Sequence, residues 1–171
     1  MTPESVGPFS RPVSVEHLPD QGLEEAVEAS GEERAALAKD LRLPAVHELR
    51  GRFRITGSRH RMRVEGTVTA RVDQVCVVTL EPFETILSEE VEVDFAAPSK
   101  MPEADAVSAG RAEPPDQIVG GRIDLGALAA EFLVLGLDPY PRKPGVDFSF
   151  DDSADKAVSP FAALKNPKPE N

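Results

Sequence analysis

The sequence predicts an α+β fold in which a twisted, mainly antiparallel sheet is covered by two helices and followed by a flexible C-terminal tail. Long segments alternate between apolar and polar residues with a period of two, which is typical of strands buried on one face. These segments follow one another through short connections, which favours an antiparallel meander. Two further segments combine a helix-capping signal with a one-sided apolar stripe. The expected twist could curl the sheet towards a half barrel.

The alternating segments define the predicted strands. We expect strands over residues 9–18, 48–56, 59–75 and 87–95, with a further short strand at 23–29. Pro12 has no amide hydrogen to donate, which places the first strand at a sheet edge. Gly57 and Ser58 are predicted to form the two-residue turn of a hairpin, and the returning strand carries His60 on its apolar face.

Two helices are predicted from their capping residues. Ser30 and Glu33 form the pattern of a capping box, which starts a helix that continues to about Leu41 and ends before Pro44. Asp124 is the expected cap of a second helix that runs to about residue 137. The second helix has a predicted buried stripe of Leu125, Leu128, Ala129, Phe132 and Leu135.

The chain length of 171 residues fits one domain with tails. We predict a single domain over residues 8–150. Residues 96–118 are poor in large apolar side chains and contain four prolines, so they are expected to form a mobile loop. Residues 151–171 are expected to be a flexible tail, in which residues 160–164 form one short apolar motif.

Several observations indicate a soluble cytoplasmic protein. No apolar run approaches the ~20 residues that a membrane-spanning helix needs, so no membrane partner is expected. The first residues contain no basic region followed by an apolar one, which argues against a secretory signal. The single cysteine, Cys76, excludes an intramolecular disulfide.

Arginines gather on one face of the predicted hairpin. Residues 42–71 carry a net charge of +6 in a chain whose formal net charge is −11. Alternate positions place six of the arginines on the polar face: Arg50, Arg52, Arg54, Arg59, Arg61 and Arg63. Arginine forms planar, multi-donor contacts with phosphate. Because Phe53 faces the core, any RNA contact is expected to involve phosphate or shape rather than bases. The alternative is a solvated strand face whose charges protect the sheet edge.

Three motifs between residues 76 and 165 resemble those of the YceD family, a group of bacterial and plastid proteins. The first is Cys76-Val-Val-Thr-Leu80-Glu81-Pro82, which is similar to a Cys-x-x-Cys-Leu-Glu-Pro signature. The second is the helix that begins at Asp124 and Leu125 and leaves through residues 139–142. The third contains Phe161 and Leu164. The chain departs from the family at Thr79, which stands where the second cysteine would be.

The resemblance implies a role in the accumulation or processing of large-subunit ribosomal RNA. It also implies that large-subunit ribosomal RNA or a pre-ribosomal particle is a partner. The resemblance transfers no catalytic residue, because none is established for the family.

The remaining cysteine, histidine and acidic residues give only weak indications of a catalytic or metal site, so no enzyme activity, cofactor or metal is expected. Thr79 cannot complete a thiolate pair, and Cys76 is therefore expected to be a buried small hydrophobe. The three histidines are far apart and lack a metal-ligand spacing. The acidic strand at residues 89–94 could in principle support a metal-dependent nuclease, but the simpler interpretation is a solvated face.

Two non-enzymatic hypotheses therefore remain. The first is a ribosome-biogenesis factor that binds RNA or an assembly intermediate through the arginine hairpin. The alternative is an acidic adaptor that binds a basic ribosomal protein, with the motif at Phe161 and Leu164 as a contact. The net charge of −11 favours the adaptor, whereas the local charge of +6 favours RNA.

Overall fold

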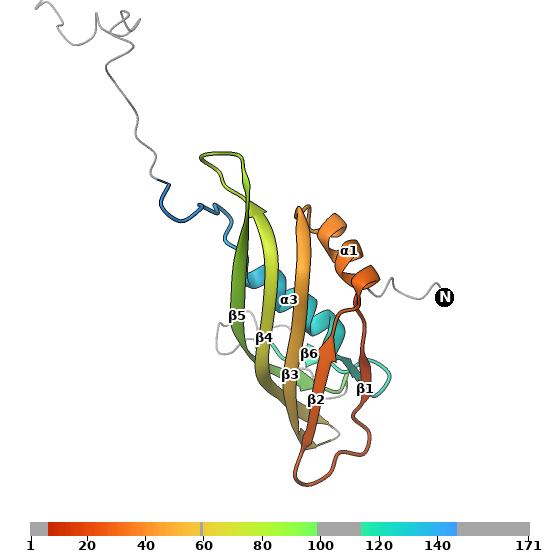
Figure 1. Ribbon diagram of the computed structural model, residues 1–171. Coiled ribbons are helices and arrows are strands. Elements are labelled where there is room, and N and C mark those ends of the chain that lie inside the picture. Colours follow the sequence, from red (N-terminus) through yellow and green to blue (C-terminus); the bar gives the residue numbers. More distant parts are fainter. Residues whose placement is uncertain (1–6, 59, 99–113, 147–171) are drawn as a thin grey trace, which may run out of the picture.

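A computed structural model describes residues 7–58, 60–98 and 114–146 and confirms the predicted α+β class (Figure 1). The main sheet has the order β2 (Leu23–Glu28), β3 (Ala45–Ser58), β4 (Arg61–Val75), β5 (Pro82–Ala96) and β6 (Asp116–Gln117). Neighbouring strands from β2 to β5 are antiparallel, as the predicted meander requires, and β6 joins β5 in parallel. A separate two-stranded ribbon pairs β1 (Pro12–Ser14) with β7 (Arg122–Asp124).

Two helices cover one face of the sheet, α1 (Gly31–Asp40) and α3 (Leu125–Gly136) (Figure 1). Helix α3 lies across β3, β4 and β5, and α1 packs against β3. The inward positions of the strands are apolar and meet the helices in one core that includes Leu49, Ile55, Val64, Leu125 and Leu133.

Gly66 permits a close approach of β3, because a Cβ atom there would lie 2.0 Å from the Arg52 carbonyl oxygen. No helix in the described ranges is long and apolar enough to cross a bilayer.

Both predicted helix caps are present. The Ser30 hydroxyl accepts a hydrogen bond from the Glu33 amide, and the Glu33 carboxylate accepts one from the Ser30 amide. Asp124 accepts hydrogen bonds from the Gly126 and Ala127 amides. These contacts satisfy amide groups that have no partner within the helices, which explains why each helix starts where it does.

Two strand predictions were wrong in detail. The predicted strand at residues 9–18 contains only the short β1, whose Pro12 pairs with Asp124 in the two-stranded ribbon. Both strands of such a ribbon are edge strands, so the edge position predicted from Pro12 is confirmed. The hairpin turn lies two residues later than predicted, because Ser58 pairs with Arg61 and both Gly57 and Ser58 belong to β3. His60 is consequently exposed in the turn and does not face the core.

Two further predictions need correction. Residues 116–117 of the predicted mobile loop form β6, which pairs with the end of β5, while residues 99–113 lie outside the described residues. In α3, Leu135 is 67% exposed and Leu133 is buried instead. With 3.6 residues per turn, the buried face is centred on Ala129 and Leu133, so Leu135 falls on its flank. The predicted tail at residues 151–171 also lies outside the described residues.

Candidate functional site

The face of the main sheet opposite the helices is free of covering elements in the described structure, and we call it the open face (Figure 1). It carries the outward side chains of β2, β3, β4 and β5. The predicted alternation is correct here: Arg50, Arg52 and Arg54 are exposed, whereas Leu49 and Phe53 are buried. Antiparallel pairing places outward residues of neighbouring strands side by side, so the surroundings of each arginine follow from the register.

Acidic residues surround the arginines on the open face. Arg54 lies between Glu24 of β2 and Glu65 of β4, and Arg63 lies beside Asp94 of β5. The register brings nine acidic residues onto the same face as six arginines. The arginines are Arg50, Arg52, Arg54, Arg61, Arg63 and Arg71, and the acids are Glu24, Glu28, Glu48, Glu65, Asp73, Glu84, Glu90, Glu92 and Asp94. The open face is therefore net negative, although the hairpin segment considered alone is positive.

Ion pairs neutralise most of these arginines. Arg63 lies 2.9 Å from both Glu92 and Asp94, and its hydrogen bonds lower the pKa of Asp94. The remaining pairs are Arg50 with Glu28 and Glu48, Arg54 with Glu24, Arg61 with Asp94, and Arg71 with Glu84. These pairs are exposed and individually weak, so it is the net negative charge of the open face that weakens the case for an RNA site here.

Arg52 differs from the other open-face arginines. Its neighbours across β2 and β4 are Ala26 and Thr67, and it forms no ion pair with any described residue. Arg52 lines a shallow cavity of about 340 Å³ together with Ala26, Glu24, Arg54 and Glu65. An anion in this cavity would contact one unpaired guanidinium but would also approach two carboxylates.

The structure also assembles three potential metal ligands that are distant in sequence. A β-bulge between Val46 and Glu48 inserts His47, whose Nε2 atom lies 3.0 Å from Asp73 Oδ1. One ligand atom each from His47, Asp73 and Glu84 lies within 4.8 Å of the others. Glu84 already forms a 3.0 Å ion pair with Arg71, so the arrangement is a polar network that joins β3, β4 and β5.

A second candidate region joins two of the predicted family motifs, and we call it the motif junction. It comprises the turn at residues 76–81 between β4 and β5 and the segment at residues 138–143 that follows α3. The Val77 amide donates to the Pro141 carbonyl at 2.9 Å, and the Gln74 side chain donates to the Asp138 carbonyl at 3.1 Å. A 3.1 Å ion pair between Lys143 and Glu81 also joins the two segments at the surface of the motif junction. Segments about 60 residues apart are thereby fixed to each other.

Cys76 lies at the centre of the motif junction. Its side chain is fully buried at the end of β4, as predicted, and its Sγ atom accepts a hydrogen bond from the Lys143 amide at 3.4 Å. This bond, together with bonds from the hydroxyl and amide of Thr79, lowers the pKa of Cys76 to about 6, although burial opposes the shift. Cys76 is thus a hydrogen-bond acceptor that holds the segment after α3, and not only a small hydrophobe.

Apolar side chains are exposed around the motif junction. Leu80 is 76% exposed, Tyr140 is 73% exposed and Val77 is 45% exposed. Leu80 also has a φ of 60°, in the left-handed region that side chains other than glycine seldom adopt. Glu81 is exposed beside it, and Pro82 begins β5. The motif junction therefore combines a buried hydrogen bond to Cys76 with an exposed apolar surface.

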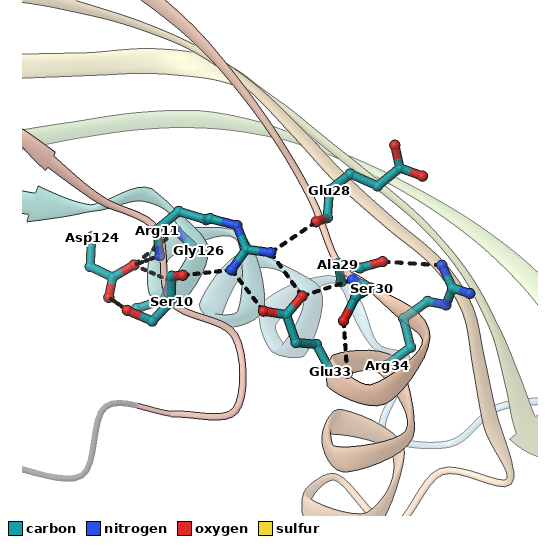
Figure 2. Close-up of polar contacts among 10 residues, drawn as sticks. Ser10, Arg11, Glu28, Ala29, Ser30, Glu33, Arg34, Asp124 and Gly126 are labelled. Carbon is teal, nitrogen blue, oxygen red and sulfur yellow. Dashed lines mark hydrogen bonds and ion pairs between the residues drawn. The ribbon is translucent and has the colours of Figure 1, made fainter.

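The predicted motif residues Asp124 and Leu125 have a structural role. Figure 2 shows Asp124 accepting hydrogen bonds from the Ser10 hydroxyl and from the Arg11 and Gly126 amides. Partial burial opposes ionisation of Asp124, but these bonds outweigh it and lower its pKa. Leu125 is fully buried in the core. Three other predicted site residues, Arg59, Phe161 and Leu164, lie outside the described residues.

Sequence reasoning missed the acidic neighbours of the arginines and the Lys143 contact to Cys76. The first could have been found from the sequence, because the outward acids of residues 90–94 and the outward arginines must share a face in a meander. The contact to Cys76 left no signal, since it uses only the backbone amide of residue 143.

Comparison with known proteins supports the family suggested by the motifs. A family model described as "Large ribosomal RNA subunit accumulation protein YceD" matches residues 64–167. The matched region includes most of β4, all of β5 and α3, and the whole motif junction, whereas β2 and all of β3 precede it. No curated protein and no solved structure matches the chain significantly.

Proposed function

Because this chain belongs to the YceD family of large ribosomal RNA subunit accumulation proteins, we propose that it acts in ribosome biogenesis as a non-enzymatic adaptor for a basic protein of the large subunit. Basic ribosomal proteins bind RNA and aggregate with it non-specifically unless their charge is screened. An acidic partner would hold such a protein until it is delivered to the assembling subunit. The expected place of action is the cytoplasm.

The charge of the open face is the observation that carries this proposal. The nine acidic residues that β2, β3, β4 and β5 place on this face outnumber its six arginines, and most of the arginines already form ion pairs. Complementary charge accelerates the association of a basic partner and rejects RNA, whose phosphates are repelled. The exposed carboxylates Glu65 and Glu90 form no ion pair with described residues and remain free to meet a cationic partner.

The adaptor function can be tested with purified components. Individual large-subunit ribosomal proteins, freed of RNA, are titrated with the chain in a salt series, and the same protein is titrated with protein-free large-subunit ribosomal RNA. We expect at least one basic protein to bind and the affinity to fall with salt. A variant in which Glu90 and Glu92 become lysine should bind more weakly. In cells that lack the chain, the ratio of large-subunit to small-subunit ribosomal RNA should fall.

RNA binding through the arginine hairpin is the second candidate function, and Arg52 is the observation that favours it. Its guanidinium is exposed and unpaired among the described residues, with the hydroxyl of Thr67 beside it. If RNA binds here, replacing Arg52 alone by Ser should cause much of the loss of RNA affinity that results from replacing all six arginines at 50, 52, 54, 59, 61 and 63. Equal RNA affinity in the wild type and the six-arginine variant would exclude this function.

A further inference from the structure

We propose that the tip of the β4–β5 hairpin anchors the basic protein partner. In this arrangement Leu80 enters an apolar recess on the partner's surface, and basic residues of the partner surround that recess. The tip lies at one end of the sheet (Figure 1), and the Val77–Pro141 hydrogen bond joins it to the chain that leaves α3. The exposed side chains of Leu80, Val77 and Tyr140 make up the proposed anchor. The inference rests on the proposed adaptor function and specifies which surface of the chain makes the apolar contact.

The conformation of Leu80 is unfavourable for the fold alone. A left-handed backbone is unfavourable for a residue with a Cβ atom, whereas glycine adopts it freely. The leucine side chain does not offset this cost by burial, because 76% of its surface is exposed. A glycine would suit the turn at least as well, so the side chain of Leu80 is better explained by a contact outside the chain.

The motif junction holds this anchor in a fixed position. The turn is tied to the segment after α3 by the Val77–Pro141 hydrogen bond, by the bond from the Lys143 amide to Cys76, and by the Lys143–Glu81 ion pair. The Leu80 amide also donates to the Cys76 carbonyl at 2.9 Å. A fixed apolar side chain loses little conformational entropy on binding, so a small surface can contribute a large share of the affinity.

The surroundings of the anchor indicate a basic protein partner. On the open face, the pair Val75 and Pro82 at the base of the tip lies next to the acidic pair Asp73 and Glu84. From there the acid-rich face extends along the strands. A partner that covers both regions must offer an apolar recess and cationic side chains, which is the chemistry of a ribosomal protein and not of RNA. Two copies of this chain would bring two net negative faces together, which disfavours self-association through the tip.

The experiment uses three variants of the full chain. Leu80→Ala removes the anchor, and Leu80→Gly removes it while relieving the backbone strain, so that the fold should be at least as stable. Val119→Ala is the matched control, because Val119 is 66% exposed but lies beside β7. Each variant is titrated with the RNA-free large-subunit ribosomal proteins, and its oligomeric state is measured by analytical ultracentrifugation. We expect both Leu80 variants to weaken binding about tenfold, which is typical of a central apolar contact, and the control to bind normally.

The outcomes separate the anchor from the adaptor function. If a ribosomal protein binds the wild type and the Leu80 variants equally, but binding is lost on changing Glu90 and Glu92 to lysine, the anchor is wrong and the adaptor function stands. If the wild type binds no ribosomal protein, both are wrong. If the wild type self-associates and Leu80→Ala makes it monomeric, the tip is occupied by a second copy and the proposal is overturned.

Discussion

The two sides of the sheet use similar ion pairs for different purposes. On the covered side, Arg11 contacts both carboxylate oxygens of Glu33, at 2.7 and 2.9 Å (Figure 2). Its guanidinium also lies over the ring of Phe9. On the open face, Arg63 contacts Glu92 and Asp94 at 2.9 Å. The distances agree, but Arg11 joins separate elements in a partly buried cluster, whereas Arg63 joins exposed neighbouring strands. Burial and connectivity therefore decide which pairs stabilise the fold and which remain available to a partner.

The largest effect should come from Asp124, the residue that joins the N-terminal segment to α3. Asp124→Ala removes the helix cap and leaves the Arg11 amide without its acceptor. We expect a loss of about 2–3 kcal/mol in the free energy of unfolding, measured by urea denaturation. Asp20→Ala, which changes an exposed carboxylate in a turn, is the control and should change stability little. Equal stability of the two variants would show that the hydrogen bonds of Asp124 to the N-terminal segment and to α3 do not contribute to the free energy of unfolding.

A smaller effect is expected when the motif junction is loosened. Gln74→Ala removes the hydrogen bond to the Asp138 carbonyl, and this should increase the opening of the segment that covers Cys76. Because Cys76 is the single cysteine, its rate of labelling by a thiol reagent reports this opening directly. We expect labelling to become about tenfold faster, which corresponds to the loss of one buried hydrogen bond. A matched change on the open face, Thr69→Ala, should leave the labelling rate unchanged.

The pH dependence of stability should distinguish the two sides. Hydrogen bonds from the Arg11 side chain and the Ser30 amide lower the pKa of Glu33 from 4.5 to about 2. A lowered folded-state pKa stabilises the fold above pH 4.5, and this contribution is lost as the pH falls from 4.5 to 2. The urea midpoints of the wild type and Glu33→Gln should therefore differ at pH 6 and converge by about pH 2. A difference that persists at low pH would mean that Glu33 acts through packing.

The smallest effect is expected on the open face. Arg63→Ala removes two ion pairs, yet the side chains are exposed and solvent screens them. We expect no measurable change in the free energy of unfolding in the same urea assay. A loss of stability as large as that of Asp124→Ala would contradict the proposal that ion pairs on the open face stabilise the fold less than contacts on the covered side.

The sequence predicted most of the fold because local rules act within single segments. The capping residues Ser30 and Asp124 were identified correctly, and strict alternation assigned the buried face of the hairpin. The errors have physical reasons. The strand β6 has only two residues and exists because it pairs with the end of β5, while the position of the turn after Gly57 depends on register rather than on composition.

The candidate site was less predictable because it depends on contacts between distant segments. The arginine pattern was correct for each strand, but the charge of the face depends on residues of β2 and β5 that lie 13 or more positions away. His47 reaches Asp73 only because a bulge turns it outward. The contact between Cys76 and residue 143 is made by a backbone amide, so the identity of the side chain at that position gives no indication of it.

The most direct test of the adaptor account is a competition experiment at physiological salt. The chain is mixed with RNA-free large-subunit ribosomal proteins and with protein-free large-subunit ribosomal RNA, and the bound fraction of each is measured. The account predicts that a basic ribosomal protein is retained, that added RNA displaces the chain from it, and that the chain itself does not bind the RNA. Salt-sensitive binding of the chain to the RNA that is lost on changing Arg52 to Ser, without retention of any ribosomal protein, would contradict the account.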